Sequence, residues 1–245
     1  MKLKVLGSNS AGNCYILENN KEALIVEAGI DFRNVKKALG FNLSKVSGAI
    51  ITHQHGDHSK YVASLVNNGI ATLALEDVFS SHDVSDSPFA KSATLNKCYK
   101  IGDFFVTPFP VSHDVPCVGY LIRHSDFGKL LFVTDTMMLN YTFAGLTQIM
   151  IETNYADDIL DRRLADDDIT LLQRNRVIES HMSLETAKDI LKNNDLSSVD
   201  NIILIHLSNG SSDEARFIRE VTELTGKRVF AADKGLEVEL STMPY

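Results

Sequence analysis

Apolar residues along this chain gather in short runs that polar turns separate. In the first half the pattern predicts strands at residues 3–6, 15–18, 23–26, 48–51, 104–107, 118–122 and 129–133. Short helices are expected at 33–39, which Gly40 follows, and at 61–67. The first half therefore predicts strand meanders interrupted by single helices.

The second half continues in the same manner. Strands are expected at 148–151, 201–205, 229–231 and 236–240, and helices at 184–191 and 214–225. This order predicts an α/β protein of two sheets with outer helices, rather than one strictly alternating parallel sheet. The acidic stretch 156–168 fits either a mobile insertion or lid, or a solvated surface helix. No repeat or linker divides the chain, so we expect a single domain over residues 1–245.

Composition places the chain among ordinary globular proteins, with 44% apolar and 23% charged residues. Cys14, Cys98 and Cys117 lack CxxC spacing, which excludes a disulfide framework and a thiolate zinc site and fits a reducing compartment. The N-terminal apolar stretch is too short for a signal peptide, and no run is long enough to span a membrane. We therefore expect a cytoplasmic protein with no membrane partner.

Acidic residues outnumber basic ones by 32 to 24, which gives a formal net charge of −8. This charge argues against broad, non-specific binding of nucleic acid. It does not exclude a polyanionic substrate, because some of the acidic side chains could face divalent cations.

The candidate chemistry is concentrated in residues 51–58, with the sequence Ile-Thr-His-Gln-His-Gly-Asp-His. His53 and His55 alternate along extended chain and so point the same way, and Gly56 then permits a sharp turn. Neutral imidazoles and a carboxylate suit Zn²⁺, and also Mn²⁺ or Fe²⁺. Four ligands within six residues do not easily surround one tetrahedral ion. The pattern therefore favours two neighbouring ions over a merely solvated polar loop.

This H-x-H-x-D-H motif resembles that of the metallo-β-lactamase superfamily, and the similarity extends over nearly the whole chain. It implies a four-layer αββα sandwich of two mixed sheets flanked by helices. It also implies three further ligands at strand ends, His113, Asp135 and His206. In the family pattern one metal ion would be held by His53, His55 and His113, the second by Asp57, His58 and His206, with Asp135 between them.

The same resemblance implies a hydrolytic mechanism. The two cations would lower the pKa of a bridging water to roughly 7, which supplies a hydroxide nucleophile at neutral pH. Asp57 would also orient that nucleophile. One position departs from the family, because Glu27 stands before Ala28-Gly29 where members usually have Asp. That position is expected to support the metal loop, and the sequence leaves the role of Glu27 open.

Within the superfamily, the chain is most similar to the WalJ/YycJ-like single-domain nucleases. The matching segments are the Gly-Ser-rich opening at 5–14, Ile-Glu-Thr-Asn-Tyr at 151–155, Ser-His-Met-Ser at 180–183 and His-Leu-Ser-Asn at 206–209. A β-lactamase is disfavoured, since Asp135 stands where the zinc β-lactamases have Cys. Glyoxalase-type thioesterases share the metal set but carry a separate helical C-terminal domain; the short stretch after His206 leads us to expect none here, so this alternative ranks second.

Further catalytic and substrate contacts follow from this similarity. His181, held by Glu152, would stay protonated and give a proton to the leaving alkoxide, or it would be a surface histidine before a helix. Arg174, Arg176 and Lys60 could bind phosphates or be ordinary surface charges. Ser208 and Asn209 are further candidate substrate contacts.

The leading hypothesis is therefore a two-metal phosphodiesterase, a DNA or RNA exonuclease that acts from the 5′ end. The alternative is a small-molecule hydrolase that cleaves a thioester, a lactone or a cyclic nucleotide. A metal-stabilised binding protein without catalysis is a third interpretation, but a structural zinc site would be closed with four ligands, not seven. The sequence leaves the physiological metal and the oligomeric state open.

Overall fold

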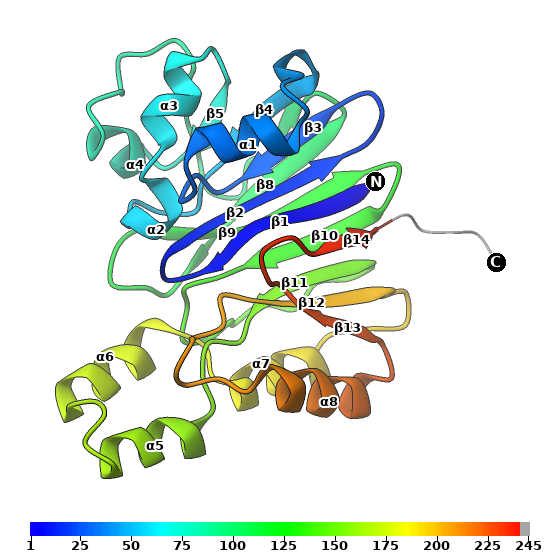
Figure 1. The fold of residues 1–245 in the computed structure, drawn as a ribbon. Helices are drawn as coiled ribbons and strands as arrows, with labels where there is room; N and C mark the ends of the chain where they lie inside the picture. Colours follow the sequence, from blue (N-terminus) through cyan, green and yellow to red (C-terminus); the bar gives the residue numbers. More distant parts are fainter. Residues whose placement is uncertain (241–245) are drawn as a thin grey trace.

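Two seven-stranded sheets pack face to face, with helices on their outer faces (Figure 1). The computed structural model describes residues 1–240. The strand orders are β14-β1-β2-β3-β4-β5-β6 and β13-β12-β11-β10-β9-β8-β7. This arrangement confirms the predicted four-layer αββα sandwich. Within the described chain, no helix has the length and apolar character needed to cross a membrane.

The first sheet consists of β1 (Lys2–Asn9), β2 (Gly12–Glu18), β3 (Ala23–Val26), β4 (Val46–Ile50), β5 (Thr72–Ala74), β6 (Ala90–Ser92) and β14 (Glu237–Glu239). Strands β14, β1, β2 and β3 pair antiparallel, and β3 to β6 pair parallel. The connections carry α1 (Phe32–Ala38), η1 (Leu43–Lys45), α2 (Gly56–Ser59), α3 (Val62–Asn67) and α4 (Glu76–Ser80). Apolar side chains of α1, α3 and α4 cover the outer face of this sheet.

The second sheet consists of β7 (Tyr99–Ile101), β8 (Phe104–Val111), β9 (Cys117–His124), β10 (Gly128–Val133), β11 (Gln148–Glu152), β12 (Asn201–Ile205) and β13 (Arg228–Ala231). Strands β7 to β10 pair antiparallel, and β10 to β13 pair parallel. Helices α7 (Leu184–Lys192) and α8 (Glu214–Thr225) cover its outer face. Between β11 and α7 the chain forms α5 (Asp157–Ala165) and α6 (Leu171–Ser180), which project from the sandwich (Figure 1).

Most predicted helices and strands are confirmed. The bounds agree best where the sequence marks the ends of an element clearly, as capping residues do for α8. The predicted ranges 23–26, 201–205 and 214–225 coincide with β3, β12 and α8. Helix α8 begins where the Asp213 side chain accepts a hydrogen bond from the Arg216 N–H and ends at Gly226, whose φ is 65°. The acidic stretch contains α5, so the surface-helix interpretation is the one the structure supports.

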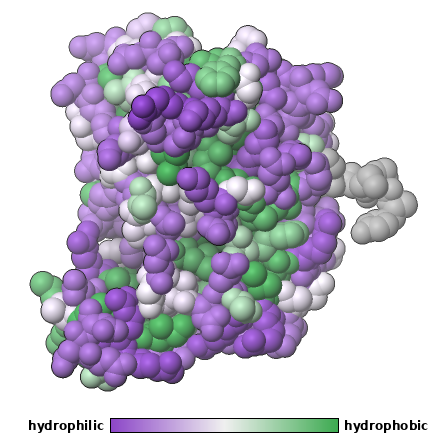
Figure 2. Space-filling model, viewed as in Figure 1, coloured by the Kyte–Doolittle hydropathy of each residue, from purple (hydrophilic) through white to green (hydrophobic). Residues whose placement is uncertain are grey.

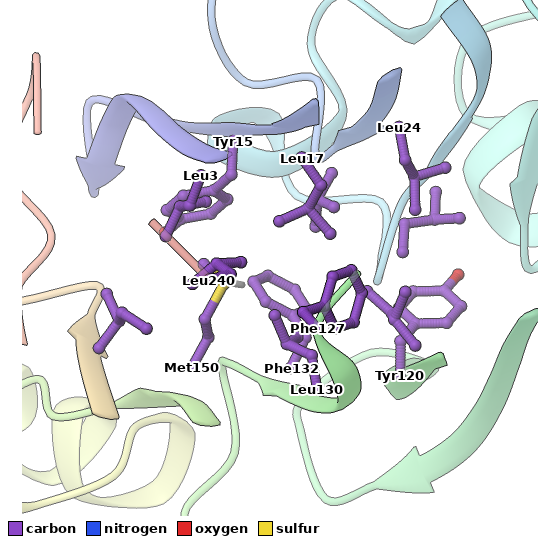
Figure 3. Close-up of a cluster of buried hydrophobic side chains, with 14 of the residues drawn as sticks. Leu3, Tyr15, Leu17, Leu24, Tyr120, Phe127, Leu130, Phe132, Met150 and Leu240 are labelled. Atoms are coloured by element: carbon purple, nitrogen blue, oxygen red, sulfur yellow. The ribbon is translucent and has the colours of Figure 1, made fainter. Parts of the chain in front are cut away.

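The main core fills the space between the two sheets (Figure 3). Tyr15 from β2 meets Phe132 from β10 edge to face, with ring centroids 5.6 Å apart. Two buried tyrosines also extend polar groups toward one end of the sandwich. The Tyr15 hydroxyl lies 2.7 Å from Ser8 Oγ, and the Tyr120 hydroxyl donates to the Ile51 carbonyl over 2.7 Å. The core thus fixes the strand ends from which residues 51–58 follow.

Candidate metal centre

Loops from both sheets meet at one edge of the sandwich and bring the seven predicted metal ligands together. His53 and His55 follow β4, and Asp57 and His58 lie in α2. The second sheet provides the other three, which follow β8, β10 and β12 and are His113, Asp135 and His206. They form two groups, and in each group one ligand atom per residue lies within 4.8 Å of the others.

The first group contains His53, His55, His113 and Asp135. Nε2 of His113 lies 3.2 Å from Nδ1 of His55. Nε2 of His53 lies 3.5 Å from Oδ2 of Asp135, and Nε2 of His113 lies 3.8 Å from the same oxygen. Three imidazole nitrogens and one carboxylate oxygen therefore converge on one small volume.

The second group contains Asp57, His58, His206 and the same Asp135. Oδ2 of Asp57 lies 3.4 Å from Nε2 of His58 and 3.3 Å from Nε2 of His206. Oδ2 of Asp135 lies 3.3 Å from Nε2 of His58. Asp135 thus contributes to both groups, as the family pattern implies for a bridging carboxylate.

The donor atoms fit a divalent cation. Nε2 of the fully buried His53 has no hydrogen-bond partner within residues 1–240, which is costly for a buried polar atom. Burial lowers the pKa of His53 well below its usual value, so its imidazole is neutral and ready to act as a ligand. Burial alone would raise the pKa of Asp135, but His206 and His58 beside it hold that pKa well below the usual carboxyl value. Neutral imidazoles and ionised carboxylates are the ligands that divalent transition metals bind.

Three residues of this edge have a left-handed backbone although none is glycine. The φ angles are 67° at Glu27, 49° at Asp135 and 55° at His206. Each residue stands one or two positions after the end of a strand, β3, β10 or β12. The left-handed turn ends each strand abruptly and keeps the side chain at the edge of the sheet. Such conformations cost free energy and gather at functional sites.

Glu27 contacts and orients the histidine loop, which we define as residues 53–58. Its Oε1 accepts a hydrogen bond from Thr52 Oγ1 over 2.6 Å and lies 3.4 Å from Nδ1 of His58. Thr52 Oγ1 also lies 2.9 Å from Nδ1 of His53. One buried carboxylate therefore orients two imidazoles, and Glu at this position contacts the loop directly.

Several residues around the ligands were not singled out in the sequence. The amide Nδ2 of Asn13 lies 3.0 Å from Nε2 of His58, and the His206 N–H donates to Ser8 Oγ over 2.9 Å. Asn154 Nδ2 donates to the His206 carbonyl over 2.9 Å. A Cβ at Gly29 would overlap the carbonyl oxygen of Asp57, so glycine is required for the close approach of these two segments. The only sequence signal was that the first three lie in the segments that resemble the nuclease group.

Glu152 and His181 form a pair beside the second group. Nδ1 of His181 lies 2.8 Å from Oε1 of Glu152, which also lies 3.0 Å from Nδ1 of His206. Oε2 of Glu152 accepts the backbone N–H of Thr136 over 3.1 Å. Burial alone would lower the pKa of His181, but the charge and hydrogen bond of Glu152 raise it above its usual value. His181 is therefore held in place with a proton available.

The site opens into a cavity of about 540 Å³. Arg176 lines this cavity, and so do Gln173 and Ser180 from the same helix. The other predicted substrate contacts lie outside its lining. Arg174 pairs with Asp161 of α5, 2.6 Å from NH2 to Oδ1, and Ser208 shapes a turn by accepting the Ser211 N–H.

Neither Asn209 nor Lys60 lies among the lining residues. Asn209 is exposed, and the Lys60 ammonium lies over the Tyr61 ring, 5.6 Å from its centroid. Of the predicted substrate contacts, the structure thus brings Arg176 alone to the cavity.

His82 holds the histidine loop from its other side. Its Nε2 lies 2.8 Å from Ser59 Oγ, which donates to the Gln54 carbonyl over 2.7 Å. Because the Ser59 hydroxyl donates its proton to the Gln54 carbonyl, it can only accept from His82, so Nε2 of His82 is the donor in that hydrogen bond. Partial burial lowers the pKa of His82, which keeps its ring neutral. This chain of hydrogen bonds fixes the backbone between His53 and His55.

We expect His82→Ala to weaken divalent metal binding roughly tenfold, because residues that orient metal ligands typically contribute this much. His82→Gln, which keeps a donor in a similar position, should restore most of the affinity. The measurement is calorimetric titration of the metal-free protein. His124→Ala is the control, since His124 pairs with Glu22 away from the site. Equal affinities for wild type and His82→Ala would contradict the role given to His82.

The sandwich and its edge cluster define a protein of the αββα metallohydrolase fold with a divalent metal centre. Residues 8–84 match the family model described as "Metallo-beta-lactamase superfamily". The matched segment contains four of the predicted metal ligands, His53, His55, Asp57 and His58.

Two curated relatives are similar over almost the whole chain. Exodeoxyribonuclease WalJ of Streptococcus pneumoniae is 27% identical, with 97% of this chain and 91% of WalJ covered. Exodeoxyribonuclease YycJ of Bacillus anthracis is 24% identical, with 97% and 94% covered. Among solved structures, the metallo-β-lactamase fold protein YhfI of Bacillus subtilis has a TM-score of 0.72 at 16% identity, covering 97% of this chain and 99% of YhfI. The short form of human tRNase Z has a TM-score of 0.66 at 14% identity, covering 99% and 100%. These two structures share the fold.

Proposed function

We propose that this chain is a metal-dependent exonuclease that hydrolyses phosphodiester bonds of DNA or RNA from the 5′ end. The observation that carries the proposal is the pair of ligand groups that share Asp135 and lie beside Glu152 and His181 in one cavity. The relatives WalJ and YycJ, both named exodeoxyribonucleases, support the substrate class. Thioester, lactone and cyclic-nucleotide hydrolysis are not favoured.

Two divalent ions would be held by the two groups, the first by His53, His55, His113 and Asp135 and the second by Asp57, His58, His206 and Asp135. Zn²⁺ suits these nitrogen and oxygen donors best, and Mn²⁺ or Fe²⁺ would also fit. When bound, such ions acidify water and offset the charge of a phosphate.

The protein's own side chains supply the remaining chemistry. The carboxylate of Asp57 faces the cavity and is placed to orient an attacking water. His181 also lines the cavity and can donate a proton from Nε2 to a leaving oxygen, because Glu152 occupies its Nδ1. Glu152 acts on the reaction through His181 and is a positioning residue.

The first experiment compares wild type and Asp57→Ala, each loaded with Mn²⁺ or Zn²⁺, on bis(p-nitrophenyl) phosphate and on 5′-labelled oligonucleotides. We expect wild type to hydrolyse both and Asp57→Ala to lose about 10³-fold in rate, equivalent to about 4 kcal/mol of transition-state stabilisation. Release of labelled mononucleotide would support attack from the 5′ end. A wild-type protein that binds metal but hydrolyses neither substrate would overturn the proposal.

A further inference from the structure

Helix α6 forms one wall of the cavity, and its cavity-facing residues include Gln173, Arg176 and Ser180. The lining also includes Ser10, from the turn between β1 and β2, and Asp57. A strand bound at the ligand groups would therefore have α6 alongside it. Figure 2 shows the arm formed by α5 and α6 at the lower left of the molecule, with a mainly hydrophilic surface.

The cavity lining carries more negatively than positively charged side chains. Asp57, Asp114 and Asp135 contribute three carboxylates, and Arg176 is the one Lys or Arg among the described residues that line the cavity. Metal ions would compensate carboxylates at the ligand groups, whereas Arg176 lies on the facing helix. A guanidinium in this position suits a phosphate, which it can bind through two parallel hydrogen bonds.

The two arginines of α6 have different surroundings. Arg174 is tied to Asp161 and so joins α6 to α5. Arg176 is two residues further on, about 200° around the helix axis, and in the described part of the chain its side chain has no ion pair or hydrogen bond. Its guanidinium is therefore free to bind a ligand in the cavity.

The position of Arg176 relative to the ligand groups is fixed. A capping box between Thr170 and Gln173 begins α6, and Nδ1 of His113 donates to the Ser180 carbonyl at its other end over 3.2 Å. Arg176 stands four residues, about 6 Å along the helix axis, before Ser180. Arg176 lines the same cavity as the ligand groups but is offset along α6 from the contact with His113, which fits a phosphate next to the one at the ligand groups.

We propose that Arg176 forms a subsite for the phosphate next to the one that is cleaved, so that the cavity selects polynucleotide strands over small phosphodiesters. This inference rests on the proposed nuclease function. It assigns to α6 the role of a substrate-binding wall.

The test is binding of a fluorescent, phosphorothioate-linked oligodeoxythymidylate, which resists hydrolysis, followed by anisotropy at several salt concentrations. We expect Arg176→Ala to weaken binding about tenfold and to reduce the salt slope by about 0.7, the contribution of one single-strand phosphate contact. Arg176→Lys should keep the slope but recover only part of the affinity. The exposed Arg219 in α8 provides the charge-matched control, Arg219→Ala, which should change neither quantity.

Failure of the subsite and failure of the proposed function give different results. If wild type cleaves ordinary oligonucleotides while Arg176→Ala binds like Arg219→Ala, the subsite is wrong and the nuclease function stands. If binding depends on Arg176 but ordinary oligonucleotides are not cleaved, the subsite stands and the nuclease function is wrong. If wild type does not bind the phosphorothioate oligonucleotide, the subsite is wrong, and cleavage of ordinary oligonucleotides alone then decides the nuclease function.

Discussion

Asp135→Asn is expected to abolish hydrolysis of bis(p-nitrophenyl) phosphate, with a loss of at least about 10³-fold. Asp135 is the one carboxylate that both ligand groups share, so its neutralisation removes a ligand from each. The loss corresponds to about 4 kcal/mol at 1.36 kcal/mol per factor of ten. Asparagine is nearly isosteric and tolerates the left-handed φ of 49° at this position, so backbone strain would not explain the result.

The accompanying measurement is metal content by elemental analysis after dialysis. We expect Asp135→Asn to retain less metal than wild type, and Asp86→Asn, at an exposed aspartate, to match wild type in both content and activity. Full metal content together with wild-type activity in Asp135→Asn would rule out the bridging role.

His181→Ala is expected to slow cleavage of an oligonucleotide by about 10² to 10³-fold, within the usual range for the loss of a general acid. Hydrolysis of bis(p-nitrophenyl) phosphate should fall much less, because p-nitrophenolate leaves without needing a proton. Metal content should be unchanged. Equal losses on both substrates, or loss of metal, would contradict a role as general acid.

The pH dependence gives a second readout for His181. Its pKa is raised in the folded protein, so the protonated form that donates is present below this pKa and is lost as the pH rises through it. Oligonucleotide cleavage by wild type should therefore decline on the alkaline side, and His181→Ala should lack that decline. Glu152→Gln, which removes the charge that raises the pKa, should move the decline to lower pH.

The sequence predicted the elements whose signals are local. Strand β12 is an uninterrupted apolar run, and α8 has both an acidic cap and a terminal glycine. Strands β5, β6 and β7 have three residues each, too few for a periodic pattern, and they were not predicted. Helix α6 was also missed, since its exposed, polar sequence gives little amphipathic signal.

The candidate site, too, was predictable from local sequence patterns only in part. The cluster at 53–58 could be recognised from spacing alone, because its ligands are close in sequence. His113, Asp135 and His206 came from resemblance to the family, since no local rule relates residues so far apart. The contact of His82 with Ser59 and the different surroundings of Arg174 and Arg176 depend on tertiary packing, which one sequence does not display.

The left-handed backbone at Glu27, Asp135 and His206 has an evolutionary consequence. Glycine would adopt these φ angles without the cost of about 1 kcal/mol or more that other residues incur. At each of the three positions the substitution that relaxes the chain also deletes a side chain of the centre. Selection for stability alone would therefore favour glycine at these three positions. Only selection for the chemistry of the site keeps Glu27, Asp135 and His206 in place.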